Sequence, residues 1–169
     1  MTPSDSNMLC AMLDFGFDYP GPAIVRYPRG AIESNQLELH DIELGRAKVV
    51  RAGNGIAILV FGTLLGAALE VANEADYTVI DMRFVKPLDT DAVIKAADDH
   101  DLLVTLEENV RAAGAGSAVL EAVSTHPTPV LCLGVPDAFV DQDSPANMQA
   151  AAGISAEKIR AAILTQMRA

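Results

Sequence analysis

The sequence predicts an α/β fold built on a mostly parallel sheet, and three observations support this class. Hydrophobic residues make up 50% of the 169 residues, which is enough for a sizeable packed core. Aromatic residues make up only 5% and Trp is absent, so the core has to be built from Ala, Val, Leu and Ile, as in sheets covered by helices on both faces. From residue 46 onward, apolar runs alternate with helical patterns, which implies right-handed crossovers between parallel strands.

The chain opens with the pattern of a helix start. We expect Thr2 to be the helix cap, with Pro3 at the first helical position and Asp5 as a shorter version of the reciprocal capping acid. The helix is expected to run to about residue 15. A turn follows, and the apolar residues 23–27 then predict a short strand.

One helix and one strand cannot bury their own apolar faces. We therefore expect residues 1–30 to be the end of a larger domain, and the chain to be a fragment of a longer protein. Residues 31–45 are mixed and polar, which is typical of a linker. Residues 46–169 then form the α/β domain.

Within this domain the expected elements follow in regular order. Strands are predicted at residues 47–50, 56–61, 78–82, 102–106 and 130–133. Helices are predicted at 63–75, capped by Thr63, at 89–98, capped by Asp89, at 116–124, and from about residues 145 and 155 onward.

Charge and cysteine content narrow the class of partner. The net charge of −11 and the lack of a Lys/Arg cluster argue against nucleic acid, so any anionic metabolite would have to be held by individual arginines. Cys10 and Cys132 are far apart and belong to no motif, and we expect both to be small buried hydrophobes of a reduced, cytoplasmic protein. No signal peptide or membrane span is expected.

Two sites could hold an anion. Arg29 follows the predicted strand at its carboxyl end, where a guanidinium can bind a phosphate, but the residues alone favour a surface arginine paired with one of the many carboxylates. Residues 114–117, Gly-Ala-Gly-Ser, precede a predicted helix and could present backbone N–H groups. The third glycine of the dinucleotide fingerprint is missing, so close packing of the helix on the strand is the favoured interpretation.

Other polar residues are expected to be structural. Glu107 and Glu108 are adjacent, so on an extended segment they point to opposite sides and cannot form a catalytic pair; one can face a domain junction while the other is solvated. Residues 81–86 place Asp81, Arg83 and Lys86 beside a strand end, which favours an ion-pair cluster that fixes the turn before Pro87. The three histidines at positions 40, 100 and 126 have no metal-ligand spacing and are assigned no role.

Taken together, several short motifs in a fixed order resemble the 1-deoxy-D-xylulose-5-phosphate synthase family. They include Thr-Pro-Ser-Asp at 2–5, Arg-Tyr-Pro-Arg-Gly at 26–30, Phe-Gly-Thr at 61–63, Asp-Met-Arg-Phe-Val-Lys-Pro-Leu-Asp at 81–89, Glu-Glu-Asn at 107–109, Gly-Ala-Gly-Ser at 114–117 and Leu-Gly-Val-Pro-Asp at 133–137. Each motif alone is unspecific, whereas the ordered set covers nearly the whole chain.

This resemblance implies a three-layer α/β/α domain of the transketolase C-terminal type, with a five-stranded sheet that has one antiparallel edge strand. Residues 1–30 would be a helix–strand remnant of the preceding pyrimidine-binding domain. The family condenses pyruvate with D-glyceraldehyde 3-phosphate, with loss of CO2, on thiamine diphosphate and Mg²⁺, and supplies isoprenoid, thiamine and pyridoxal biosynthesis. The missing domains would carry the catalytic residues and the ligands of cofactor and metal, so this chain alone is expected to be inactive and to bind neither.

One substrate residue of the family maps onto this chain, because Arg29 matches the arginine that holds the phosphate of glyceraldehyde 3-phosphate. The resemblance also implies a homodimer. Residues 110–113 and 141–143 depart from the family's usual loops, which puts local loop geometry in doubt. Two alternatives stay open: another transketolase-like enzyme, such as transketolase or a 2-oxo-acid dehydrogenase subunit, and a non-catalytic interaction module.

Overall fold

The protein is built around one five-stranded sheet. The computed structural model describes residues 1–28 and 42–168. The strands are β1 (Lys48–Arg51), β2 (Ile56–Phe61), β3 (Thr78–Asp81), β4 (Leu102–Val110) and β5 (Val130–Val135). Their order is β1-β3-β2-β4-β5; β1 pairs antiparallel with β3, and the other pairs are parallel. The expected mostly parallel sheet with one antiparallel edge strand is confirmed.

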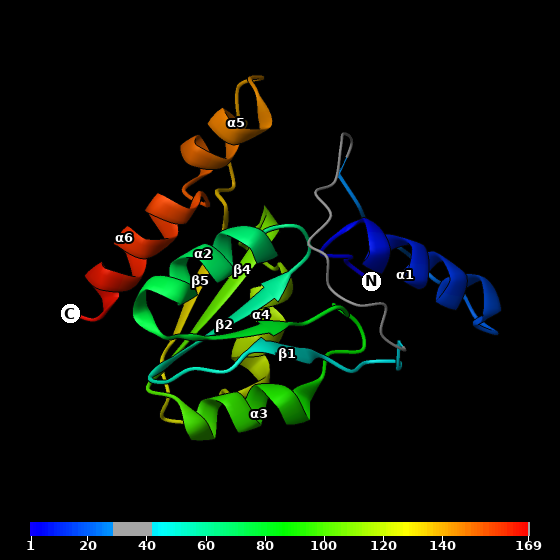
Figure 1. Cartoon of the computed structure of the whole chain (residues 1–169), viewed down its shortest axis with the longest axis horizontal. Helices are drawn as coiled ribbons and strands as arrows, with labels where there is room; N and C mark the ends of the chain where they lie inside the picture. The colour runs from blue at the N-terminus through cyan, green and yellow to red at the C-terminus, as the bar shows by residue number, and fades with distance from the viewer. Residues whose placement is uncertain (29–41, 169) are drawn as a thin grey trace.

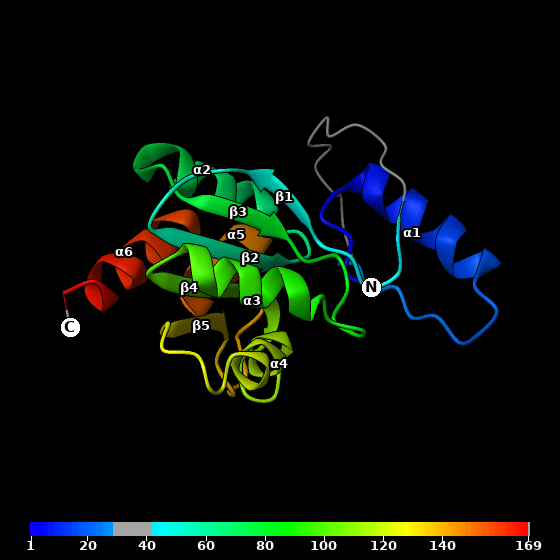
Figure 2. The ribbon, with the colours of Figure 1, turned by 90° about the horizontal axis from the view of Figure 1, so that it is seen from below.

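Two helical layers cover the sheet, because each face of its central strands is apolar. On one face, α2 (Leu65–Ala75) and α6 (Ala156–Gln166) pack over side chains such as Ile58 and Val104. On the other, α3 (Thr90–Asp99) and α4 (Ala115–Ala122) pack over the alternating side chains, such as Leu59 and Leu103. Figures 1 and 2 show the sheet between these layers, and Figure 1 shows α5 (Pro145–Ala152) away from the sheet. The three-layer α/β/α architecture is therefore confirmed.

Strand β2 lies at the centre of the sheet, and its sequence explains this place. All six residues of β2 are buried, as expected for a continuous apolar run that is covered on both faces. Its neighbours β3 and β4 lie on opposite sides, with Phe61 of β2 level with Glu107 of β4. The chain moves from β2 to β3 on one side and then crosses to β4 on the other. The strand order thus reverses between β2 and β4, which makes a crevice at their carboxyl ends.

The first helix begins later than expected. Helix α1 spans Ser6–Asp18, and its cap is Asp5, whose side chain accepts a hydrogen bond from the Met8 N–H at 2.8 Å. The prediction of Thr2 as cap is wrong, because Thr2 lies four residues before the helix and binds the α/β domain instead. Its backbone N–H donates to the carbonyl of Arg83 at 2.9 Å, and this contact draws the start of the chain onto the α/β domain.

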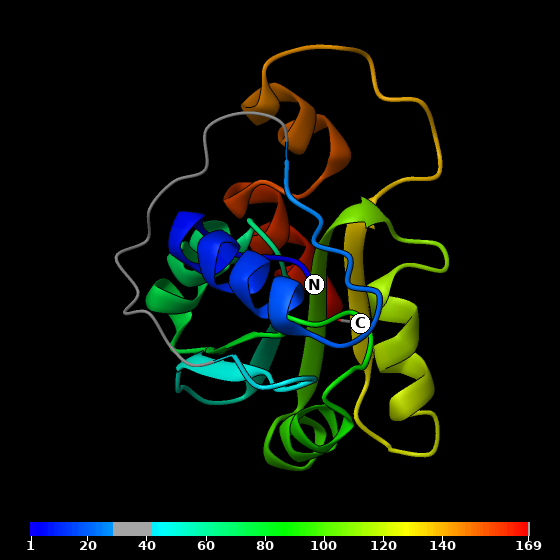
Figure 3. The same ribbon diagram turned by 90° about the vertical axis from the view of Figure 1, so that its right-hand side faces the viewer.

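The strand predicted at residues 23–27 is also wrong. These residues form no regular element; the Met1 amine donates to the Ile24 carbonyl, and the Arg26 N–H donates to the Met1 carbonyl. Met1 thus pairs with Val25 as one rung of a parallel ladder, and a single rung does not make a strand. In Figure 1, α1 stands to one side of the sheet, and in Figure 3 the segment after it returns across the end of the sheet.

The remaining differences concern element ends. Strand β4 runs to Val110 instead of residue 106, because β5 continues to pair with it. Helix α2 begins at Leu65 without a side-chain cap, since the Thr63 hydroxyl bonds to Glu108 instead. Asp89 caps α3 as predicted, accepting from the Ala92 N–H at 3.1 Å.

Candidate functional site

A cavity of 260 Å³ lies at the crevice between the carboxyl ends of β2 and β4. The α/β domain contributes Gly62, Thr63 and Glu108 to its walls. The N-terminal segment, by which we mean residues 1–28, contributes Pro3, Arg26, Tyr27 and Pro28. Open parallel sheets place their ligands in this kind of crevice. Here the protein's own segment at residues 26–28 occupies one wall of it.

The turn after β2 shapes this cavity. Gly62 has a φ of +97°, a conformation that costs a residue with a Cβ but not glycine. The turn places the Thr63 hydroxyl against a carboxylate oxygen of Glu108. The other oxygen accepts from the Gln149 amide at 2.8 Å, so both oxygens of this carboxylate are bound.

Arg29, the predicted phosphate ligand, lies outside the described residues. Its neighbour in sequence, Pro28, is described and lines the cavity. Arg26 lines it too, and its guanidinium donates to the backbone carbonyl of Glu108 at 3.4 Å. The cavity therefore has a cation from the segment and a carboxylate from the sheet on its walls.

A second, larger cavity of 620 Å³ lies between the N-terminal segment and the α/β domain. Its walls are mostly apolar and include Phe15, Ile24, Phe84 and Pro87. The rings of Phe15 and Phe84 meet edge to face, with centroids 6.0 Å apart. The segment thus rests on the domain through apolar contacts as well as through hydrogen bonds.

The anion site considered at residues 114–117 is filled by the protein itself. Glu107 is 2% exposed, and its carboxylate accepts from the N–H groups of Ala115 and Gly116, each at 2.9 Å. A Cβ on Gly116 would lie 2.5 Å from the Thr105 hydroxyl, and one on Gly114 would lie 2.5 Å from Glu107. Close packing is confirmed, and the amino end of α4 is already neutralised by a carboxylate.

The two adjacent glutamates point apart, as predicted. Glu107 faces α4, whereas Glu108 faces the cavity and the N-terminal segment. The expectation that one of them is solvated is wrong, because Glu107 is buried and Glu108 is half-buried with both oxygens bound. The two carboxylates therefore do not form a catalytic acid–base pair with each other.

Asp81 joins the N-terminal segment to the end of β3. It is 1% exposed, and it accepts from the Ser4 hydroxyl at 2.8 Å and from the Arg83 backbone N–H at 3.2 Å. Burial raises the pKa of this carboxyl from 3.8 to about 6, against the opposing effects of the Ser4 hydrogen bond and the Arg83 charge.

The ion-pair cluster expected at residues 81–86 does not form. Asp81 binds the backbone of Arg83 and not its guanidinium, and Lys86 is exposed. Arg83 is itself 4% exposed with a φ of +59°, and its Nε and Nη2 have no hydrogen-bond partner within the described part of the chain. The Asp81 carboxylate is bound by the Ser4 hydroxyl and by the Arg83 backbone N–H, so it forms no ion pair with the charged side chains.

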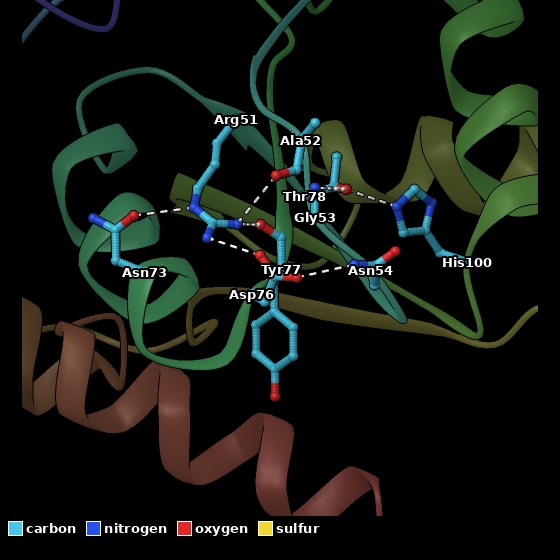
Figure 4. A network of polar contacts seen from close by, with 9 residues as sticks. All are labelled: Arg51, Ala52, Gly53, Asn54, Asn73, Asp76, Tyr77, Thr78 and His100. Carbon is cyan, nitrogen blue, oxygen red and sulfur yellow. Dashed lines mark hydrogen bonds and ion pairs between the residues drawn. The ribbon is translucent and has the colours of Figure 1, made fainter.

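A polar network at the opposite, amino end of the strands is structural (Figure 4). Arg51 binds Asn73 and Asp76, each at 3.0 Å, and Asn54 binds Asp76 at 2.9 Å. Hydrogen bonds from Asn54 and Arg51 lower the pKa of Asp76. A Cβ on Gly53 would lie 2.2 Å from the Asp76 carbonyl, so glycine is required there. The network ties the loop before β2 to the turn before β3.

His100, to which the sequence assigned no role, completes this network (Figure 4). Its Nδ1 lies 2.9 Å from the Ala96 carbonyl, which can only accept, so Nδ1 carries the proton of the neutral ring. Its Nε2 then accepts from the Thr78 hydroxyl at 2.8 Å, and the same hydroxyl oxygen accepts from the Gly53 N–H at 3.0 Å.

Thr78→Val should therefore lower the free energy of unfolding by about 2 kcal/mol, because it removes both hydrogen bonds and leaves the Gly53 N–H unpaired. Urea unfolding followed by circular dichroism measures the change. Thr78→Ser keeps the hydroxyl and serves as the control. A valine variant as stable as the serine variant would contradict the hydrogen-bond role of Thr78.

Cysteines and possible metal ligands add no further site. Both cysteines are free thiols, but Cys10 is exposed and Cys132 half-buried, so the expectation that both are buried is wrong. On α1, the buried side chains are Met8 and Met12, and Cys10 lies between them on the outer side. No metal-binding group of three or more His, Cys, Asp or Glu occurs among the described residues. Nor, within the same ranges, is any helix long and apolar enough to cross a membrane.

The sequence did not point to three polar residues at the junction. Ser4, Thr63 and Gln149 bind carboxylates that are 77, 45 and 41 positions away in the chain. Thr63 has a local signal, but it is that of a helix cap, and the pairing with Glu108 depends on the register of β2 against β4. Tertiary contacts of this kind are not visible in a local pattern.

Comparisons with known proteins agree with this architecture. A family model described as the transketolase C-terminal domain matches residues 45–159. The chain is 52% identical over 167 residues to the 1-deoxy-D-xylulose-5-phosphate synthase of Pseudomonas savastanoi pv. phaseolicola, which covers 96% of this chain and 26% of that protein. It is 45% identical over 172 residues to the enzyme of the same name from Hahella chejuensis, with 99% and 27% covered. The chain thus spans about a quarter of the length of these relatives.

Solved structures show the same fold. A structure titled "Split gene transketolase, inactive beta4 tetramer" superposes with a TM-score of 0.90 at 28% identity, covering 97% of this chain and 56% of that one. A transketolase from Campylobacter jejuni superposes with a TM-score of 0.70 at 14% identity and supports the fold alone. Because the family model matches more than half of the residues, the chain belongs to the transketolase C-terminal domain family.

Proposed function

We propose that this chain acts as the C-terminal portion of a 1-deoxy-D-xylulose-5-phosphate synthase. That enzyme condenses pyruvate with D-glyceraldehyde 3-phosphate with loss of CO2. The observation that carries the proposal is the identity of 45–52% to synthases of this name along 96–99% of the chain. Transketolase itself is the weaker candidate, since the transketolase-titled structures are 28% and 14% identical.

In this proposal, thiamine diphosphate and Mg²⁺ are held by the other domains of the enzyme. Thiamine diphosphate would stabilise the carbanion left when pyruvate loses CO2. The part played by this chain is to bind the second substrate and to dock those domains. Arg29 holds the phosphate of glyceraldehyde 3-phosphate, and the placement of Pro28 at the crevice supports a ligand near this point.

The proposed division of the chain is a remnant of the pyrimidine-binding domain at residues 1–30, a linker at 31–45 and the C-terminal domain at 46–169. The hydrogen bonds between Met1 and residues 24–26 support the first part, because they have the pattern of one rung of a parallel sheet. Phe17 and Ile24 are 90% and 79% exposed, so this segment offers apolar surface for the rest of its own domain and for a homodimer. The compartment would be the cytoplasm.

The isolated chain should show no turnover when it is incubated with pyruvate, glyceraldehyde 3-phosphate, thiamine diphosphate and Mg²⁺. A fusion behind the preceding domains of the Pseudomonas savastanoi synthase should form the pentulose phosphate product. The neighbour titled as an inactive tetramer supports the first expectation. Turnover by the isolated chain, or an inactive fusion that is folded and dimeric, would contradict the proposal.

In the active fusion, Arg29→Ala should raise the KM for glyceraldehyde 3-phosphate about tenfold or more, because a charge-assisted contact to the phosphate is lost. The KM for pyruvate, which has no phosphate, should not change. Arg111→Ala, at an exposed arginine, is the control with the same loss of charge. An unchanged KM for the aldehyde would remove Arg29 from the site.

A further inference from the structure

Glu108 connects three separate parts of the molecule. One carboxylate oxygen accepts from Thr63, in the turn that leads from β2 to α2. The other accepts from Gln149, in α5, at 2.8 Å. Its backbone carbonyl accepts from the guanidinium of Arg26, in the N-terminal segment, at 3.4 Å. A half-buried carboxylate with both oxygens bound is held in one rotamer. Glu108 therefore links the turn after β2 and helix α5 to the end of β4, where Arg26 binds.

Helix α5 is held to the sheet by the hydrogen bond between Gln149 and this residue, and its carboxyl end by Ala152 and Ile154, which pack on the core. None of the residues of α5 is buried, and the chain between β5 and α5 forms no regular element over residues 136–144. The hydrogen bonds of Asn147, at the start of α5, are local and go to the side chains of Asp143 and Ser144. In Figure 3, the orange α5 lies above the carboxyl end of the yellow-green strand β4. Gln149 is the side chain of α5 that reaches down to this strand.

Residues 26–28 approach Glu108 from the other side and bind its backbone, not its carboxylate. Arg26, Tyr27 and Pro28 share the 260 Å³ cavity with Glu108 and Thr63. The Arg26 guanidinium donates to the backbone carbonyl of Glu108 at 3.4 Å, so its place depends on where the end of β4 holds this residue. Removing the Glu108 side chain would weaken the turn, α5 and the segment together.

We propose that Thr63, Glu108 and Gln149 form a positioning unit that holds residues 26–28 at the carboxyl end of the sheet. Through this unit, α5 fixes the segment whose next residue is the phosphate ligand of the proposed function. The docking of residues 26–28 by this unit does not depend on the proposed function, whereas its effect on substrate binding rests on that function. The three residues act through the segment and do not touch the substrate.

Limited trypsinolysis of the 169-residue chain tests the docking. Cleavage after Arg26 requires residues 26–28 to leave the cavity, so formation of the 1–26 fragment follows the population of the undocked segment. Glu108→Ala should speed this cleavage about tenfold, as expected for the loss of hydrogen bonds to a charged group. Glu108→Gln has the same shape and can bond to both Thr63 and Gln149, so it should stay within about twofold of the wild type.

Two further variants keep the test decisive if Glu108→Ala fails to fold. Gln149→Ala and Thr63→Val each leave the carboxylate in place and remove one of its partners, and each should speed the cleavage at least about threefold. Glu70→Ala, at an exposed glutamate of α2, is the matched control and should have no effect. Cleavage that stays at the wild-type rate in Gln149→Ala and Thr63→Val would overturn the proposal.

The fusion enzyme gives the second readout. Glu108→Ala should raise the KM for glyceraldehyde 3-phosphate about tenfold, and Gln149→Ala should raise it at least about threefold. In both variants, kcat and the KM for pyruvate should stay within about twofold of the wild type. Glu108→Gln should restore the wild-type KM. A fall in kcat alone, or a Glu108→Gln variant as impaired as the alanine variant, would show that the charge itself acts in the reaction and would overturn the positioning role. An inactive wild-type fusion would count against the proposed function only, since the cleavage experiment does not use activity.

Discussion

Glu107→Ala is expected to lower the free energy of unfolding by about 3–5 kcal/mol, the largest effect of any substitution considered for this protein. The variant would leave the buried N–H groups of Ala115 and Gly116 without an acceptor, at about 1–3 kcal/mol each. It would also open a cavity beneath α4, because the side chain is 2% exposed. Urea unfolding followed by circular dichroism measures the loss.

Two further variants separate the causes. Glu107→Gln keeps the volume but turns an N–H2 group toward one of the two donors, so it should lie between the wild type and the alanine variant. Glu121→Ala changes an exposed glutamate on the same helix and should alter stability by no more than about 0.5 kcal/mol. If Glu107→Ala were as stable as Glu121→Ala, the carboxylate would not hold the amino end of α4.

The contribution of Asp81 to the stability of the protein should fall as the pH rises from about 4 to 7. Its pKa is raised from 3.8 to about 6 in the folded state, so the folded protein keeps a proton that the unfolded chain has lost. The contribution is fully present below pH 3.8 and is lost as the pH rises through 6. The difference of about 2.2 pH units corresponds to about 3 kcal/mol at 1.36 kcal/mol per unit.

Asp81→Asn isolates this contribution. An asparagine can still bond to the Ser4 hydroxyl and the Arg83 N–H, but it carries no proton to lose. The free energy of unfolding of the variant, measured with urea at several pH values, should rise relative to that of the wild type by about 3 kcal/mol between pH 4 and 7. A constant difference between the two proteins over this range would show that Asp81 does not titrate with a raised pKa.

The regular elements of the α/β domain could be predicted because their causes are local. The run at residues 56–61 is apolar without interruption and became the central strand, and Asp89 stands where a cap is needed before α3. The N-terminal prediction failed where a tertiary contact decides. The local pattern favours Thr2 as the cap and Asp5 as the reciprocal capping acid, whereas in the structure Thr2 binds Arg83 and Asp5 caps the helix.

The candidate site was predictable only in part for the same reason. That Glu107 and Glu108 point apart follows from strand geometry alone. Which carboxylate is buried, and what binds it, depends on elements brought together by the sheet: α4 for Glu107, and α5 with the turn after β2 for Glu108. Residue spacing carries no trace of these pairings.

The two edges of the sheet differ in how readily they could accept a foreign strand. Strand β1 has four residues, a register shift between Val49 and Arg51, and a charged residue at each end, all of which hinder pairing with another chain. Strand β5 has six mostly apolar residues and is the edge of the described sheet next to β4. If the protein aggregates through strand addition, the contact should therefore begin at β5, and a single lysine introduced there should suppress it.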